Sequence, residues 1–232
     1  MNIVDKTVIV TGSGKGIGLE TVKLLLEKGA KVAGWSRSET PVTHDNFMAV
    51  KVDVGNQQEV NTAYEKTVAR FSKDISVLIN NAGVGHEAAF EDLDAEKWHQ
   101  MFRTNVDSIF YCSKLVIPHM KVLEEGHIVN ISSIAGTNGI PGMAAYCGTK
   151  HAVRGLSQSM FKELRNFGIK ISTIYPGSTN TNFFNDFTSV SGHNNMMMPQ
   201  DLALTILQVL ESSANYLPVD IEVRPLQPKG KQ

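Results

Sequence analysis

The sequence predicts an α/β protein that is a single domain, residues 1–232, built on one doubly wound parallel sheet. Short apolar runs alternate with segments of helical periodicity along the chain, and no internal repeat interrupts this order. Crossovers through helices are right-handed and make neighbouring strands parallel. At 232 residues, the chain is long enough to bury the core of one such domain. Ligands in these sheets bind beyond the carboxyl ends of the strands.

The expected elements follow one another in strict alternation. The strands are expected at residues 8–10, 31–35, 47–52, 75–79, 128–131, 170–174 and 219–223. Helices are expected from the first glycine-rich turn to Gly29, around 60–71, from Asp94 to about 123, from the segment of Tyr146 to about 167, and over 199–210. Asp94 is the expected N-cap of the long third helix, and Gly29 and Gly168 are expected to end their helices.

A glycine-rich turn, T-G-x-x-x-G-x-G, joins the first strand to the first helix. The stricter G-x-G-x-x-G pattern does not fit this stretch. The free N–H groups and partial positive charge at the start of the helix form an anion site that suits a pyrophosphate. The alternative is a flexible turn without a ligand. The residues expected to contact the cofactor here are Gly12, Ser13, Lys15, Gly16, Ile17 and Gly18.

The end of the second expected strand favours NADP(H) over NAD(H). An NAD site places an acidic residue about 20 residues past the glycines to bind the ribose, but here the strand ends in Ser36 and Arg37, and the first acid is Glu39. Arg37 and Lys15 are cations that suit a 2′-phosphate. The alternative is that both are merely solvated charges.

Composition excludes several classes of function. Hydrophobic residues make up 42% and charged residues 19%, and the net charge is -1, so no basic excess indicates a nucleic-acid partner. No apolar run approaches the ~20 residues that span a bilayer, and the first strand begins too early to leave room for a signal peptide. Cys112 and Cys147 form neither a disulfide framework nor a metal motif. We therefore expect a cytoplasmic protein with no membrane, nucleic-acid or metal partner.

Two segments lack a regular pattern. Residues 178–199 mix aromatic residues and methionines with small polar ones, and they follow no period of 2 or 3.6. A stretch of this kind is either a functional lid or disordered, and its apolar side chains favour a lid over an apolar ligand. The tail, 228–232, is expected to be flexible.

Tyr146 and Lys150 are the candidates for proton chemistry, because residues four apart share a helix face. An ammonium about 4 Å from a phenol stabilises the phenolate by about 4 kcal/mol at an effective dielectric near 20. That energy corresponds to about three pKa units, so Lys150 is expected to bring the phenol of Tyr146 towards neutrality. Ser133 lies thirteen residues upstream at the end of a strand. Asn105 is a polar residue on an otherwise apolar helix surface, where it needs a hydrogen-bond partner.

These motifs, in this order, make the sequence similar to the short-chain dehydrogenase/reductase family over nearly its whole length. The matching residues are Thr11-Gly12-x-x-x-Gly16-x-Gly18, Asn80-Asn81-Ala82-Gly83, Asn105, Ser133, Tyr146-x-x-x-Lys150 and Pro176-Gly177. The resemblance implies a Rossmann-type seven-stranded sheet of order 3-2-1-4-5-6-7 and a catalytic tetrad of Asn105, Ser133, Tyr146 and Lys150. It implies that Tyr146 is the general acid, that Ser133 holds the carbonyl oxygen, that Lys150 binds the nicotinamide ribose, and that Asn105 holds a water on a proton path.

The resemblance also implies further cofactor contacts. Thr179 and Thr181 resemble positions that fix the carboxamide, and Asp53 and Val54 resemble positions near the adenine. The remaining expected contacts are Asn81, Ala82, Gly83, Tyr146, Lys150, Pro176 and Gly177. The chain ends without the glycine-rich segment of many relatives that reduce acyl-carrier-protein thioesters, which argues against a role in fatty-acid synthesis. Pairing of the two long helices across a two-fold axis implies a homodimer or homotetramer.

The function expected from these observations is the NADPH-dependent reduction of a small-molecule carbonyl. Two alternatives stay open: an NADP(H)-binding sensor or scaffold without turnover, and an alcohol dehydrogenase that works in the reverse direction. The substrate also stays open among a pteridine side-chain ketone, a 3-keto acid derivative, and a xenobiotic ketone or quinone. His86, Glu87 and Met143 are candidates for its pocket.

Overall fold

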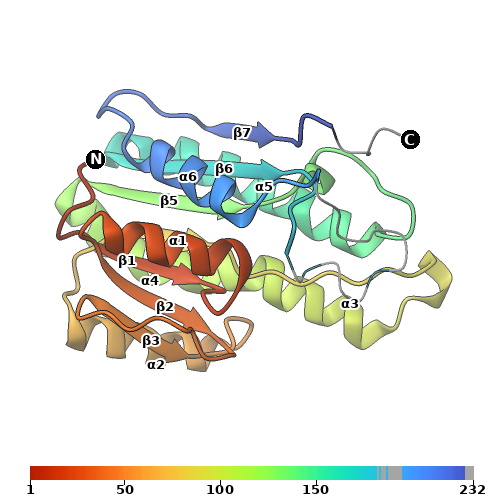
Figure 1. The fold of residues 1–232 in the computed structure, drawn as a ribbon, viewed down its shortest axis with the longest axis horizontal. Helices are drawn as coiled ribbons and strands as arrows, with labels where there is room; N and C mark the ends of the chain where they lie inside the picture. Colours follow the sequence, from red (N-terminus) through yellow and green to blue (C-terminus); the bar gives the residue numbers. More distant parts are fainter. Residues whose placement is uncertain (182, 184–186, 188–194, 228–232) are drawn as a thin grey trace.

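A computed structural model describes residues 1–181, 183, 187 and 195–227. These residues form one seven-stranded sheet of order β3-β2-β1-β4-β5-β6-β7, in which every neighbouring pair is parallel (Figure 1). The expected doubly wound sheet and the strand order implied by the resemblance are confirmed. The strands are β1 (Thr7–Thr11), β2 (Lys31–Ser36), β3 (Phe47–Lys51), β4 (Ile75–Asn80), β5 (Gly126–Ile131), β6 (Ile169–Pro176) and β7 (Asp220–Val223).

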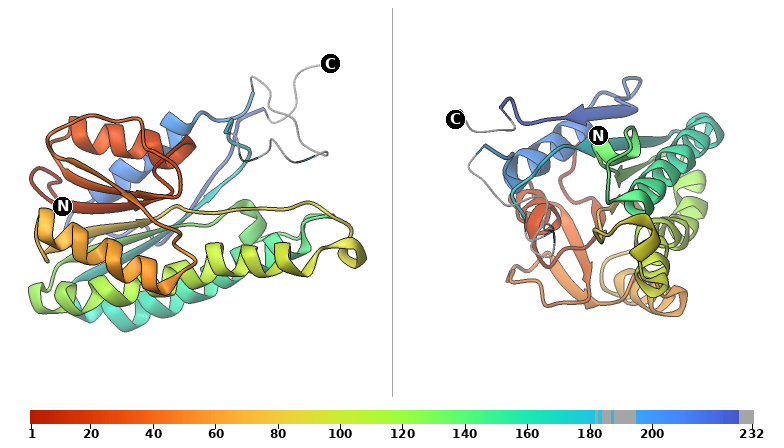
Figure 2. Two further views of the ribbon diagram at one scale, coloured as in Figure 1. Left: turned by 90° about the horizontal axis from the view of Figure 1, so that it is seen from below. Right: turned by 90° about the vertical axis from the view of Figure 1, so that its right-hand side faces the viewer.

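Helices cover both faces of the sheet (Figure 2). The sheet separates two apolar cores, one under the helices of each face. On one face α1 (Gly16–Glu27) packs against α6 (Pro199–Leu210). On the other face lie α2 (Gln57–Arg70), α4 (Ser108–Leu123) and α5 (Ala144–Leu164). The central strands are buried throughout, as their continuous apolar runs predict, whereas the edge strands β3 and β7 are partly exposed. Short 3-10 turns occur at Phe90–Asp92, Ile134–Gly136 and Arg165–Phe167.

The single long helix expected from Asp94 to about 123 is wrong in one respect. Asp94 is the N-cap, and its carboxylate accepts hydrogen bonds from the N–H groups of Glu96 and Lys97. However, α3 (Ala95–Phe102) passes into a π-helical turn, Arg103–Asp107, before α4 begins. A π turn carries one extra residue in the helical register. This local widening lies at Asn105 and Thr104, both buried beside the cleft described below.

Two of the expected helix ends are confirmed by the backbone conformation of the glycines that follow them. Gly29 and Gly168 adopt the left-handed conformation, with φ of 81° and 70°, and each follows a helix as expected. The unpatterned segment 178–199 is described only at 178–181, 183, 187 and 195–199, and the tail 228–232 lies outside the described residues. Within the described part of the chain, no helix has the length and apolar character needed to cross a membrane.

Candidate active site

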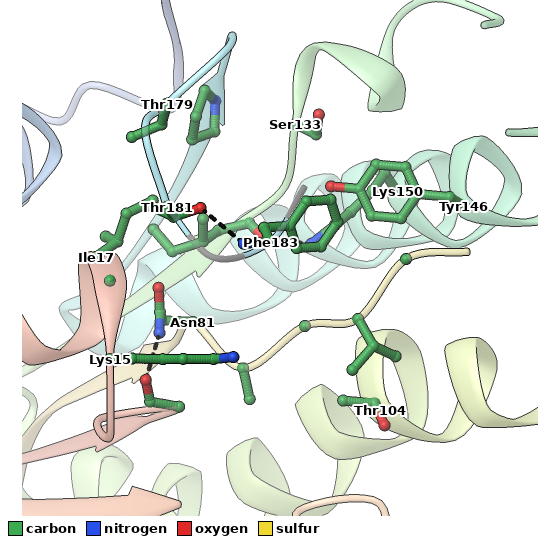
Figure 3. Close-up of a pocket in the computed structure, with 18 of the residues that line it drawn as sticks. Lys15, Ile17, Asn81, Thr104, Ser133, Tyr146, Lys150, Thr179, Thr181 and Phe183 are labelled. Atoms are coloured by element: carbon green, nitrogen blue, oxygen red, sulfur yellow. Dashed lines mark hydrogen bonds between the residues drawn. The ribbon is translucent and has the colours of Figure 1, made fainter. Parts of the chain in front are cut away.

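A cleft of about 750 Å³ opens at the carboxyl ends of the strands. It runs from the end of β2, across the turn between β1 and α1, to the face of α5 that carries Tyr146 (Figure 3). The structure brings together on this cleft most of the residues singled out from the sequence. These are Gly12, Lys15, Gly16, Ile17, Arg37, Asp53, Val54, Asn81, Ala82, Gly83, Ser133, Tyr146, Lys150, Pro176, Gly177, Thr179 and Thr181.

Three residues expected at the site do not line the cleft. Ser13 is fully buried, and its hydroxyl pairs with that of Thr40 at 2.9 Å. Gly18 lies against β1, where an added Cβ would stand 2.3 Å from the carbonyl oxygen of Gly12. It therefore permits the close approach of helix and strand. Asn105 lies behind the wall of the cleft and is hydrogen-bonded to the backbone there.

The glycine turn has the geometry of an anion cradle. Gly12 and Gly16 have φ of 69° and 58°, a conformation that L side chains rarely adopt. The N-cap of α1, Lys15, makes no side-chain cap hydrogen bond, so the side chain leaves the first N–H groups of the helix to other acceptors. These donors and the helix dipole favour a negatively charged group over the turn.

The loop after β4 is tied to the same turn. The hydroxyl oxygen of Thr11 accepts hydrogen bonds from the backbone N–H groups of Asn81 and Ala82, both at 3.0 Å. The side-chain amide of Asn81 donates to the carbonyl oxygen of Thr11 at 2.9 Å. The amide of Asn81 therefore positions the two loops relative to each other, and this loop borders the cleft.

Two exposed cations stand at the end of the cleft formed by β2. Lys15 and Arg37 line it, and neither takes part in an ion pair with a described residue. The turn packs closely onto this region, because an added Cβ on Gly14 would lie 2.4 Å from the hydroxyl oxygen of Ser38. The hydroxyl of Ser36 donates to the carbonyl oxygen of Ser38 and shapes the backbone between them.

Tyr146 and Lys150 lie on the same face of α5, and both are buried. The Nζ atom of Lys150 is 5.7 Å from the centroid of the Tyr146 ring and donates to the carbonyl oxygen of Ile131 at 2.9 Å. The side chain of Ser133 lines the cleft beside Tyr146 (Figure 3). Ser133 follows β5, and its Oγ accepts from the N–H of Ala135 at 3.1 Å. Three of the four groups of the expected tetrad thus share one corner of the cleft.

The prediction that Lys150 brings the pKa of the Tyr146 phenol towards neutrality is wrong. Burial raises the pKa of Tyr146 to about 12, and the nearby hydroxyl of Ser133 opposes this rise only in part. Burial likewise lowers the pKa of Lys150 to about 8. Desolvation disfavours the charged form of both groups, and it is the largest cause of each shift. At neutral pH the phenol is therefore protonated.

Asn105 and Lys150 both lie close to Gly83. An added Cβ on Gly83 would lie 3.5 Å from Oδ1 of Asn105 and 3.6 Å from Nζ of Lys150. The amide of Asn105 is fully engaged by backbone groups of Val84 and by the hydroxyl of Thr149. In this arrangement Asn105 holds the wall of the cleft next to Lys150.

The sequence predicted some of the other residues that line the cleft and missed the rest. His86 and Met143 line the cleft as expected, but Glu87 does not. Phe183, from the segment expected to be a lid, also lines it. The residues that sequence reasoning missed are Gly14, Trp35, Ser36, Ser38, Val52, Val84, Gly85, Gln100, Thr104, Ile131, Ser132, Ile134, Ile140 and Ser178. Most of them directly precede or follow a residue that was identified, and this position is the only sequence signal for them.

Comparisons with known proteins agree with this geometry. Residues 6–191 match the model of the family described as short chain dehydrogenase. An uncharacterised oxidoreductase of Staphylococcus saprophyticus is 38% identical over 189 residues, which cover 78% of this chain and 76% of the relative.

Two solved structures are similar over almost the whole chain. A 3-ketoacyl-(acyl-carrier-protein) reductase from Brucella melitensis, complexed with NADH, superposes with a TM-score of 0.88 at 25% identity and covers 95% of this chain and 97% of its own. ElxO with NADP bound superposes with a TM-score of 0.84 at 27% identity and covers 94% and 98%. The neighbours thus include complexes with each of the two nicotinamide cofactors.

Proposed function

Because the chain belongs to the short-chain dehydrogenase family, we propose that it is an NADPH-dependent oxidoreductase that reduces a small-molecule carbonyl to an alcohol. The observation that carries the proposal is one cleft bordered both by an uncapped helix N-terminus with its glycine turn and by a corner that holds the buried Tyr146 and Lys150 and the half-buried Ser133. In this proposal the helix N-terminus binds an anionic cofactor, and the corner around Tyr146 donates a proton.

The residues present fit a nicotinamide dinucleotide. The φ of Gly12 and of Gly16 is positive, so side chains at these positions would strain the backbone, and the uncapped start of α1 beside them offers N–H groups to a pyrophosphate. Arg37 and Lys15 suit the additional phosphate of NADPH, and no carboxylate from the end of β2 opposes it. When bound, NADPH supplies the hydride. Thr179, Thr181 and the Pro176-Gly177 pair line the same cleft and are the proposed contacts of the nicotinamide end.

Tyr146 is the proposed acid. Its phenol is protonated at neutral pH because burial raises its pKa to about 12. As hydride reaches the carbonyl carbon, the oxygen gains negative charge, and the Tyr146 hydroxyl passes its proton to that oxygen. The hydroxyl of Ser133 is placed to hold the oxygen, and the ammonium of Lys150 favours the phenolate that remains.

The proposal includes a homo-oligomer. Phe110, Val122 and Leu123 of α4 and Leu156 of α5 are large apolar side chains that stand exposed on neighbouring helices. Pairing of these helices with those of a second copy would cover them. Sedimentation equilibrium tests this part: a monomer at micromolar concentration would contradict it.

The test of the activity is a panel of ketones and aldehydes followed by NADPH absorbance, with NADH run beside it. Tyr146→Phe should lose roughly 10²–10⁴-fold in kcat and retain NADPH binding. The double variant of Arg37→Ala and Lys15→Ala should raise the KM for NADPH by about tenfold or more and leave the KM for NADH unchanged.

Full activity of Tyr146→Phe would remove the proposed acid. A tenfold preference for NADH in the unaltered protein would remove the cofactor assignment. Tight NADPH binding without reduction of any carbonyl would favour the alternative of a cofactor-binding sensor.

A further inference from the structure

The part of the cleft around Tyr146 is apolar. Val84, Ile140 and Phe183 pack against a buried cluster that includes Tyr146 and Met143. All of these residues line the cleft. Nearby, His86 and Gln100 also line the cleft. The Nε2 atom of His86 and the Oε1 atom of Gln100 are hydrogen-bonded to each other at 2.9 Å. A ligand that reaches the Tyr146 hydroxyl therefore contacts mainly apolar surface.

Gly85 makes room for an aromatic ring over Tyr146. An added Cβ at this position would lie 2.6 Å from Cζ of Phe183, 3.1 Å from Cζ of Phe187 and 3.2 Å from Cδ2 of Tyr146. The Phe183 ring lies 5.4 Å from the Tyr146 ring, centroid to centroid, and the two planes are tilted by 49° (Figure 3). Phe187 extends the stack, again at 5.4 Å from Phe183. Any residue larger than glycine at position 85 would displace this stack.

Charged groups are placed elsewhere on the cleft. Among the described lining residues, the lysines and arginines are Lys15, Arg37 and Lys150. Lys15 and Arg37 belong to the glycine turn and the end of β2. Lys150 already donates to the carbonyl oxygen of Ile131. A carboxylate or phosphate on the substrate would lose water here without a dedicated cation to replace it, which is costly.

We infer that Gly85 and Phe183 select a neutral carbonyl compound that carries a flat apolar ring next to its carbonyl group. With the carbonyl oxygen at the Tyr146 hydroxyl, that ring meets the aromatic surface of Phe183, and aromatic pairs in tilted or offset contact gain energy beyond the area they bury. This inference rests on the proposed function, since it takes Tyr146 as the group that meets the carbonyl.

The test compares three ketones: a phenyl ketone, a linear ketone of the same carbon number, and a keto acid. The kcat/KM of the unaltered protein should favour the phenyl ketone over the linear ketone by about tenfold. Phe183→Ala and Phe183→Leu should both reduce this ratio to about twofold, because neither retains a ring. Gly85→Ala should reduce it as well, because the new Cβ displaces the Phe183 ring.

Gly139→Ala is the matched control. Gly139 also lies in a loop, but an added Cβ there meets nothing within 4 Å, so the ratio should stay that of the unaltered protein. Thermal unfolding of each variant shows whether it folds. The Leu variant keeps apolar volume at position 183, so the test does not depend on the Ala variant being stable.

Calorimetric binding of the phenyl ketone and the keto acid to the NADP-loaded protein separates the two proposals. Reduction of carbonyls without a ring preference, a preference for the keto acid, or an unchanged ratio in both Phe183 variants would overturn the inference and leave the proposed function standing. Tighter binding of the phenyl ketone than of the keto acid, without reduction of any carbonyl, would overturn the proposed function and with it the placement of the carbonyl at Tyr146.

Discussion

The side chain of Asn105 pairs with both backbone polar groups of Val84. Its Oδ1 accepts from the Val84 N–H at 2.8 Å, and its Nδ2 donates to the Val84 carbonyl oxygen at 2.8 Å. Nδ2 also donates to Oγ1 of Thr149 at 3.0 Å, and the Thr149 hydroxyl donates to the carbonyl oxygen of Tyr146 at 2.8 Å. One buried amide thus joins the loop after β4, the π-helical turn and the part of α5 that carries Tyr146.

Replacement of Asn105 should therefore affect stability and the site together. Asn105→Ala leaves the N–H and carbonyl of Val84 without their partner, and unpaired buried groups cost roughly 1–3 kcal/mol. We expect the free energy of unfolding, measured in urea, to fall by about this amount. We also expect cofactor affinity to fall, because Val84 and Gly83 border the cleft.

Thr149 provides the matched comparison. Thr149→Val removes only the branch from Asn105 to Tyr146, so its loss should be smaller than that of Asn105→Ala. Thr149→Ser keeps the hydroxyl and should behave like the unaltered protein. An Asn105→Ala variant with unchanged stability and unchanged cofactor affinity would show that the amide has no part in holding this wall.

The sequence predicts the fold and the outline of the site because both depend on local patterns. Buried parallel strands read as continuous apolar runs, and the turn between β1 and α1 needs glycines whose φ is positive at Gly12 and Gly16. Strand ends then gather at one edge of the sheet. No local pattern, however, marks the π turn at Arg103–Asp107, since one extra residue in a single turn is too short to establish an apolar period of its own.

The other differences arise from tertiary packing. The side chain of Ser13 turns towards Thr40, 27 residues away in the sequence, and away from the cleft. The phenol of Tyr146 was expected near neutrality from a charge–charge estimate at high effective dielectric. Its burial, which depends on residues as distant as Phe183 and Gly85, reverses the sign of the shift. The degree to which distant residues bury a side chain cannot be predicted from a single sequence.

Lys150 should make stability depend on alkaline pH. Burial lowers its pKa from 10.5 to about 8. Between these values the unfolded chain binds a proton that the folded protein releases, so the free energy of unfolding rises with pH in this window. Relative to Lys150→Met, which has no such group, the unaltered protein should gain up to about 1.4 kcal/mol per pH unit from about pH 8 to 10.

Urea unfolding of both proteins at several pH values measures this difference. Lys114→Met replaces an exposed lysine of α4 and is the control. A constant difference between the unaltered protein and Lys150→Met across the window would mean that Lys150 does not titrate there. If its ammonium supports catalysis, kcat/KM for carbonyl reduction should also fall as pH rises through about 8.

His127 should make stability depend on acidic pH. It lies on β5 and is completely buried, and burial, assisted by the charges of Lys170 and the amino terminus, lowers its pKa to about 3. The Ser172 hydroxyl donates to the Pro218 carbonyl oxygen at 2.7 Å, so its oxygen accepts the proton of the His127 Nε2 at 2.9 Å. Burial thus favours the neutral imidazole, and the hydrogen bond to Ser172 places its proton on Nε2.

Below about pH 6.5 the unfolded chain binds a proton on His127, whereas the folded protein does not bind this proton until the pH falls to about 3. The free energy of unfolding should fall as the pH drops through this window, by up to about 1.4 kcal/mol per unit. His127→Gln keeps a donor for Ser172 but does not titrate, so it should lose less stability than the unaltered protein between pH 6 and 4. His99→Gln, at an exposed position of α3, should instead follow the unaltered protein. Parallel curves for the unaltered protein and His127→Gln, measured by urea unfolding, would show that His127 is protonated in the folded state and that β5 tolerates its charge.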